Sequence, residues 1–142
     1  MKKTILLLII VVFTSFTQLY AKGIGENIDR ELVKCKSTED STMAITDCYN
    51  IAIRSWDKEL NSQYKLLLKE QPKDVKIRFR DAQRAWVKYK DLEVSAMQTF
   101  YGQEEGTIWG LVMLQSQLNI IRDKAIDLYR LRNSINLSGE EH

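Results

Sequence analysis

The sequence predicts an all-α protein, an antiparallel three-helix bundle with a short disulfide-stapled N-terminal arm. Three observations support this fold class. Apolar residues recur every three or four positions through most of the chain, which is the period of one helix face. No segment alternates polar and apolar residues for long enough to form a strand. The single proline, Pro72, and a turn with two glycines at 102–106 divide the chain into long helical segments, which short turns place side by side.

Residues 1–21 have the features of an export signal. Lys2 and Lys3 precede an apolar run, and Ala21 supplies the small residue before a cleavage point. The run is too short to span a membrane comfortably. We therefore expect a bacterial Sec-type signal peptide, a periplasmic or secreted location, and a mature chain of about 121 residues that begins at Lys22.

Removal of this signal leaves a chain without net charge. The complete sequence has 21 basic and 19 acidic residues, and the loss of Lys2 and Lys3 makes the two counts equal. A nucleic-acid-binding domain needs a basic face. We therefore expect no nucleic-acid partner and, after cleavage, no membrane span.

Cys35 and Cys48 are the only cysteines, and they lie 13 residues apart. In an oxidising compartment an even pair most simply forms a disulfide, which here would attach the arm at 22–41 to the first long helix. A metal site is the alternative, but the only histidine is the terminal His142. We therefore expect a disulfide, no metal and no cofactor.

Within the arm at 22–41, Lys22 to Ile28 contains two glycines and is expected to be a flexible lead-in, followed by a short helical turn at 31–35 and a polar linker at 36–41. Polar capping residues then lead into a first long helix at 42–70. Pro72 ends this helix, because the residue before a proline is pushed out of the helical region. Its apolar stripe comprises Cys48, Ala52, Trp56, Leu60, Tyr64, Leu67 and Leu68.

A second helix is expected at 73–101, and its broad apolar sector suggests that it is the central element of the bundle. Its main stripe comprises Val75, Ala82, Ala85, Trp86, Tyr89, Ala96 and Phe100.

The third helix is expected at 107–131, with a seam typical of a coiled coil. Polar residues at 132–142 are expected to form a disordered tail. The seam comprises Leu111, Leu114, Leu118, Ile121, Ala125 and Leu128.

Hairpin geometry predicts which side chains face each other across the two turns. One turn is centred near residue 72 and the other near residue 104, so residues at equal distances from each centre become neighbours. An amide pair would satisfy two semi-buried polar groups, and a guanidinium on an indole would add a cation–π contact. The predicted pairs are Asn61 with Gln83, Tyr64 with Arg80, and Arg122 with Trp86.

Catalytic machinery is hard to find in this sequence. There is no usable histidine, no glycine-rich phosphate loop and, if the cysteines are oxidised, no free thiol. Glu104 and Glu105 are adjacent on a turn, whereas a glycosidase needs two carboxylates set across a cleft. We therefore expect that the protein is not an enzyme.

A set of motif residues runs through the three predicted helices. It comprises Cys48, Trp56, Leu60, Asn61 and Tyr64, then Ala82-Gln83-Arg84-Ala85-Trp86 with Tyr89 and Asp91, and finally Arg122. With these residues the chain resembles the lysozyme inhibitor LprI-like family over about 35–131. We interpret the motif as mainly structural. The resemblance implies an exported bacterial helical domain, and the activity named for the family is inhibition of lysozyme.

The resemblance favours an exported binding protein that blocks the cleft of a muramidase without catalysis. An acidic turn could enter a cleft on a basic enzyme, a lysozyme-type glycosidase, and Trp109 follows this turn at the end of the bundle. The alternative is an envelope interaction or immunity module without lysozyme-inhibiting activity. The expected partner contacts are Tyr101, Gln103, Glu104, Glu105 and Trp109.

Overall fold

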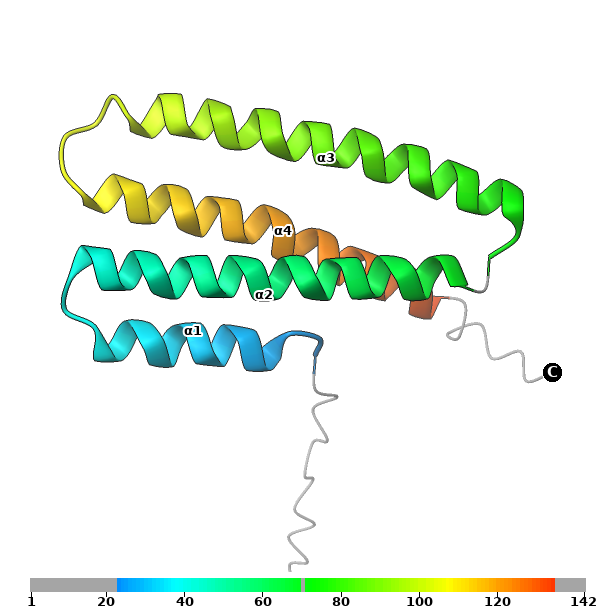
Figure 1. The fold of residues 1–142 in the computed structure, drawn as a ribbon, viewed down its shortest axis with the longest axis horizontal. Coiled ribbons are helices and arrows are strands. Elements are labelled where there is room, and N and C mark those ends of the chain that lie inside the picture. Colours follow the sequence, from blue (N-terminus) through cyan, green and yellow to red (C-terminus); the bar gives the residue numbers. More distant parts are fainter. Residues whose placement is uncertain (1–22, 70, 135–142) are drawn as a thin grey trace, which may run out of the picture.

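The computed structural model describes residues 23–69 and 71–134, which form four helices joined by short connections (Figure 1). The predicted signal peptide and the predicted tail beyond Ser134 lie outside the described residues. The helices are α1 (Glu26–Thr38), α2 (Thr42–Lys69), α3 (Lys73–Tyr101) and α4 (Ile108–Ser134). The all-α class is confirmed. The prediction of three helices is wrong, because the N-terminal arm forms a fourth, and α4 continues into the segment predicted as tail.

The N-terminal arm is helical because its apolar residues are periodic and face α2. Gly25 starts α1 with a φ of 68°, a left-handed conformation that glycine adopts without steric cost. Its carbonyl accepts the N–H groups of Ile28 and Asp29 at 2.9 and 3.1 Å. Ile28, Leu32 and Cys35 then pack against the core at steps of four and three. The predictions of a flexible lead-in up to residue 28 and of only a short turn at 31–35 gave too much weight to the glycines, because α1 runs from Glu26 to Thr38.

The predicted disulfide between Cys35 and Cys48 is confirmed. It joins the last turn of α1 to the first half of α2, with Cα atoms 5.8 Å apart. Ser41 accepts the backbone N–H of Ala44 at 3.1 Å through its Oγ, so it caps α2 as the polar residues before this helix predict.

The core lies between α2 and α4, with α1 covering one side. Tyr49 shows how the three helices meet: its hydroxyl accepts a hydrogen bond from Lys36 of α1 at 3.0 Å and donates one to Gln115 of α4 at 3.1 Å. Each large apolar side chain buried in this core contributes roughly 1.5–3 kcal/mol. The buried apolar residues are Leu32, Cys48, Tyr49, Ala52, Trp56, Leu60, Leu67, Leu118, Ile121, Ala125 and Leu128.

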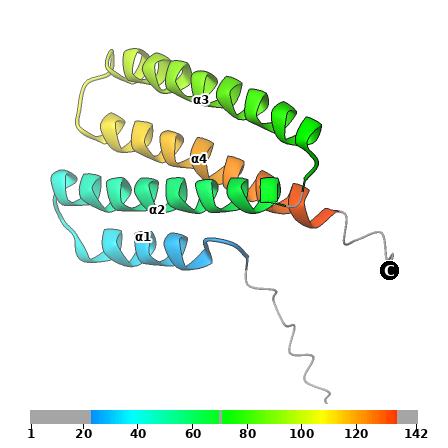
Figure 2. The same ribbon diagram turned by 45° about the vertical axis from the view of Figure 1, so that its right-hand side comes forward.

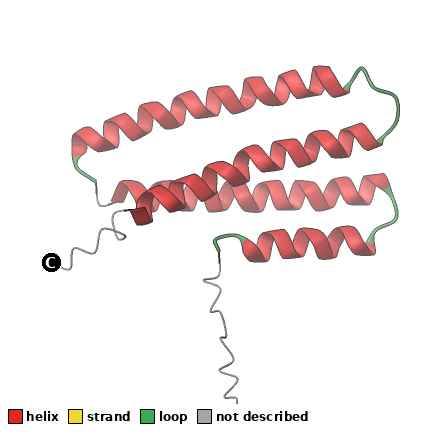
Figure 3. Ribbon diagram, turned by 180° about the vertical axis from the view of Figure 1, so that it is seen from behind, coloured by secondary structure: helices red, strands yellow, loops and turns green. Residues whose placement is uncertain are grey.

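The position of α3 overturns the prediction that it is the central helix. It contributes no buried residue, and its main neighbour is α4. The helices therefore lie in the order α1, α2, α4, α3, which the views from a second direction and from behind also show (Figures 2 and 3). Most of its predicted stripe is exposed, including Ala82, Ala85, Tyr89, Ala96 and Phe100.

The side of α3 that is half-buried is richer in polar residues than the predicted stripe. Apart from the adjacent pairs at 75–76 and 93–94, which widen it, its members follow steps of three and four, as one helix face requires. They are Val75, Lys76, Phe79, Gln83, Trp86, Lys90, Glu93, Val94, Met97 and Tyr101. Long apolar stems on lysine and glutamine pack along a neighbouring helix while their polar ends reach water, so a half-buried contact tolerates them.

Candidate protein-binding surface

The connection from α1 to α2 and the connection from α3 to α4 lie at the same end of the molecule (Figures 1 and 3). The two connections touch each other, because the hydroxyl oxygens of Thr42 and Thr107 are 3.4 Å apart. We call this region, residues 39–43 and 100–109, the loop end. It contains all five residues that the sequence analysis assigns to partner contact.

Two of these five residues form an aromatic stack across the α3–α4 turn. The rings of Tyr101 and Trp109 lie 6.0 Å apart with an interplanar angle of 18°. Phe100 meets the ring of Tyr101 edge-on at 5.1 Å. Stacked and edge-on aromatic pairs stabilise a structure by about 0.5–1.5 kcal/mol beyond their buried area. Tyr101 and Trp109 are half-buried, so their stack holds the turn in place.

The other three residues project from the turn itself. Gln103, Glu104 and Glu105 are exposed, and the amide of Gln103 donates to the carbonyl of Thr99 at 3.3 Å. Glu39 and Asp40, exposed on the neighbouring connection, add two more carboxylates. None of these four carboxylates forms an ion pair within residues 23–69 and 71–134. The loop end therefore presents unneutralised negative charge.

Exposed apolar side chains, which the sequence analysis missed, also gather at the loop end. Met43, Phe100 and Ile108 are 79, 63 and 58% exposed. Phe100 was assigned to a buried stripe, and the other two belong to the first turns of α2 and α4, where core and surface positions are hard to distinguish from periodicity. A protein interface typically has exposed apolar residues surrounded by a polar rim, and the loop end has this composition.

The remaining motif residues divide between the core and the surface. Trp56 and Leu60 are buried, whereas Asn61, Arg84, Tyr89 and Asp91 are exposed. The predicted amide pair of Asn61 with Gln83 is wrong. Asn61 donates within its own helix, to the carbonyl of Asp57 at 2.8 Å and to its carboxylate at 3.1 Å. The predicted neighbours Tyr64 and Arg80 line one surface pocket, which also contains Gln83, Arg84 and Val87.

The turn geometry predicts that Arg122 lies on Trp86, and this prediction is wrong. Its guanidinium binds Asp29 of α1, with Nε and a terminal nitrogen 3.0 and 2.8 Å from the carboxylate, and it lies 5.6 Å from the ring of Trp56. Lys124 occupies the predicted place, with Nζ 5.9 Å from the ring centre of Trp86. The register across the second turn is therefore displaced by two residues, which turns Arg122 toward α1 and α2.

Asp29 is the structural residue that the sequence analysis missed. The predicted disulfide was enough to place Asp29 near Trp56. Because Cys35 faces Cys48 in an antiparallel pair of helices, Asp29 has to lie within one turn of Trp56.

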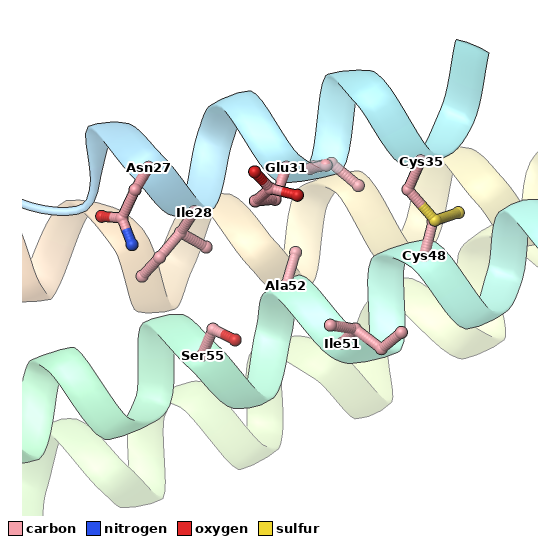
Figure 4. Close-up of a pocket in the computed structure, with 9 residues that line it drawn as sticks. Asn27, Ile28, Glu31, Cys35, Cys48, Ile51, Ala52 and Ser55 are labelled. Atoms are coloured by element: carbon pink, nitrogen blue, oxygen red, sulfur yellow. A yellow bond between two sulfur atoms is a disulfide. The ribbon is translucent and has the colours of Figure 1, made fainter. Parts of the chain in front are cut away.

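Four pockets on the described part of the chain have no lining residue from the loop end. One, of about 370 Å³, is a groove between α1 and α2 with the disulfide at one end (Figure 4). Glu31 is its only charged lining residue. The described part of the chain has no cluster of three or more acidic, histidine or cysteine residues that could hold a metal ion. None of the described helices is long and apolar enough to cross a membrane.

Comparisons with known proteins identify a family and a solved structure of similar fold. A family model described as lysozyme inhibitor LprI matches residues 34–128. The crystal structure of an uncharacterized protein from Burkholderia thailandensis matches with a TM-score of 0.70 and 24% identity, over 79% of this chain. The match covers 56% of that longer chain, and at this identity it supports the fold alone. A search of curated proteins found no match.

Proposed function

The chain belongs to the lysozyme inhibitor LprI family, and from this membership we propose that it is an exported binding protein that blocks a lysozyme-type glycosidase without catalysis of its own. The partner is a protein, as for an inhibitor of this kind. The inhibitor acts by occupying the sugar-binding cleft with its loop end. Enzymes of this class work with two carboxylates set across a cleft, so a segment lodged between them excludes the substrate.

The observation that carries this proposal is the combination of charge and apolar surface at the loop end. The carboxylates of Glu104 and Glu105 attract a basic enzyme and speed association. Met43 and Ile108 lie at the same end with exposed apolar side chains. They form the apolar centre of the proposed interface, and such a centre contributes most of the binding energy. The Tyr101–Trp109 stack holds the turn, which lowers the ordering cost on binding.

An extracytoplasmic location fits the same function. The disulfide between Cys35 and Cys48 persists in oxidising compartments and is rare in the cytosol. The predicted signal peptide at 1–21 would deliver the chain to the periplasm or the medium, where muramidases act on the cell wall.

A turbidity assay with several lysozyme types tests the proposal. The protein is expected to slow the clearing of a bacterial suspension at near-stoichiometric amounts for at least one type. The double substitution Glu104→Lys with Glu105→Lys is expected to weaken inhibition by about tenfold or more, because it reverses the charge that meets the enzyme.

Asp123→Lys with Asp127→Lys is the matched control. It makes the same charge change at exposed positions of α4, about 22 Å along the helix from Ile108. Inhibition equally weakened by both pairs would show that only overall charge matters and would remove the loop end as the contact. No inhibition of any lysozyme type would leave the alternative, an envelope interaction or immunity module.

A further inference from the structure

The exposed side of α3 is a regular apolar seam without a partner in the described chain. Successive members are three or four residues apart, which is the spacing of a heptad repeat. Tyr89 and Leu92 at its centre are 52 and 62% exposed. We call this set the outer stripe: Ala82, Ala85, Tyr89, Leu92, Ala96 and Thr99.

The outer stripe is distinct from the side of α3 that meets α4. Phe79, Gln83 and Trp86 are half-buried on the α4 side, whereas every member of the outer stripe is exposed. A helix of 29 residues without one buried side chain gains little from its own bundle. A second apolar seam on such a helix is explained if another helix covers it.

We propose that the outer stripe pairs with the same stripe of a second copy of the chain, in an antiparallel α3–α3 contact. In an antiparallel pair of heptad seams, each a position of one helix lies opposite a d position of the other. Tyr89 is an a position of the outer stripe and Leu92 is a d position. The central layers then join Tyr89 to Leu92 of the second copy, and Leu92 to its Tyr89. Ala85 lies opposite Ala96, and Ala82 opposite Thr99, so small residues flank the large central layers and let the helices approach closely.

Charge complementarity supports this orientation. Lys88 and Asp91 lie along one edge of the outer stripe, and both are exposed. In the antiparallel register, Lys88 comes within about 3 Å, measured along the axis, of Asp91 of the second copy, and symmetry repeats the pair. A parallel pairing would instead bring the Lys88 edge against the opposite edge of the second copy's stripe, where Trp86 and Glu93 are half-buried on the α4 side. Lys90 binds one carboxylate oxygen of Asp91 at 3.1 Å, which leaves the other oxygen for Lys88.

The contact fits a reversible dimer. The six residues of the outer stripe extend for about 26 Å, which is short for a coiled coil. The core between α1, α2 and α4 is complete without it. The fold therefore survives dissociation, and substitutions in the outer stripe can be examined in a folded monomer.

Sedimentation velocity across the micromolar range tests the pairing. The parent protein is expected to dimerise with concentration, and Tyr89→Glu with Leu92→Glu is expected to be monomeric throughout. The matched control, Ile77→Glu with Val87→Glu, places the same charges at exposed apolar positions of α3 outside the stripe and is expected to dimerise like the parent. Circular dichroism checks that all three are helical. A parent protein that stays monomeric would overturn the proposal and would leave the outer stripe to a different protein partner. A dimer that persists in the Tyr89→Glu with Leu92→Glu variant would also overturn it.

A charge exchange tests the register. Lys88→Glu or Asp91→Lys alone is expected to weaken the dimer by about 2- to 30-fold, because each creates two like-charge contacts at exposed positions. The double variant restores opposite charges and is expected to recover the affinity of the parent. Failure of the double variant to recover would exclude this register.

Cysteine cross-linking tests the direction. Under oxidation, a mixture of the Ala85→Cys and Ala96→Cys proteins is expected to form a covalent dimer, whereas either protein alone is not. In the antiparallel register, equivalent residues at 85 lie about 16 Å apart, too far for a disulfide. Cross-linking by one variant alone would show a parallel pairing and overturn the antiparallel one.

Discussion

The carboxylate of Asp29 on α1 accepts the indole N–H of Trp56 on α2 at 3.0 Å. The same carboxylate binds Arg122 of α4 through its other oxygen, at 2.8 Å to a terminal nitrogen. Trp56 is completely buried, so the protein rather than bulk water has to satisfy its N–H. One acidic side chain thus connects the three helices that form the core, and both Trp56 and Arg122 are residues of the family motif.

Asp29→Ala is expected to lower the free energy of unfolding by about 2–4 kcal/mol. The substitution leaves the N–H of a buried indole without an acceptor and removes the nearest anion of a half-buried guanidinium. Urea unfolding followed by circular dichroism measures the change. Glu31→Ala, an exposed carboxylate on the same helix, is expected to stay within about 0.5 kcal/mol of the parent. Equal stability of the two variants would show that Asp29 does not hold the helices together.

Gly25→Ala and Gly110→Ala are expected to change stability in opposite directions. A methyl group at residue 25 would overlap the ring of Trp56 and force a left-handed φ on alanine, which costs about 1–3 kcal/mol. Gly110 lies within α4 with open space around its Cα, so alanine there gains about 0.5–1 kcal/mol in helix propensity. Thermal unfolding of both variants gives the comparison. A stable Gly25→Ala protein would contradict the close approach of α1 to Trp56.

Reduction of the Cys35–Cys48 disulfide is expected to lower the free energy of unfolding by about 2–4 kcal/mol, because the unfolded chain regains the freedom that the bridge removes. Urea unfolding with and without a reductant measures this difference. The control is a variant with both cysteines replaced by serine, whose stability the reductant should leave unchanged. A parent protein equally stable under both conditions would show that α1 is held by its noncovalent contacts alone.

Met43→Ala with Ile108→Ala is expected to weaken inhibition of the target enzyme by about 5- to 30-fold, because exposed apolar side chains at an interface centre contribute most of the binding energy. Both residues are exposed, so stability should change by less than about 0.5 kcal/mol. The inhibition constant in a lysozyme assay is the measurement. Val33→Ala with Leu131→Ala removes exposed apolar surface away from the loop end, and inhibition should be unchanged. A weaker inhibitor in this control would point to another contact surface.

The three long helices could be predicted because their boundaries depend on local chemistry. Pro72 and the glycines of the 102–106 turn act on the local backbone, so α3 begins and ends as predicted. The first helix was missed although Ile24, Ile28, Leu32 and Cys35 follow helical spacing. A helix of 13 residues is marginal alone and forms because the disulfide and Trp56 hold it.

Which helices pack against each other could not be predicted from the sequence, because the packing depends on contacts between residues far apart in the chain. The α3 helix has two apolar sides, and periodicity alone cannot decide which of them meets the bundle. The contact side contains Gln83, Lys90 and Glu93, while the more apolar side faces solvent. A difference of two residues in the second turn was enough to move Arg122 from Trp86 to Trp56. The residues of the loop end could be predicted as a group because a turn is a local feature.

Because α3 is attached mainly to α4, the chain divides into parts of different local stability. Amide hydrogens of α2 and α4 are protected by the buried core and exchange through global unfolding, whereas α3 can open while the rest stays folded. Hydrogen exchange should therefore be fastest along α3 among the long helices. A second copy bound along the outer stripe would slow that exchange in proportion to dimer population, so the dynamics of one helix report the assembly state of the whole protein.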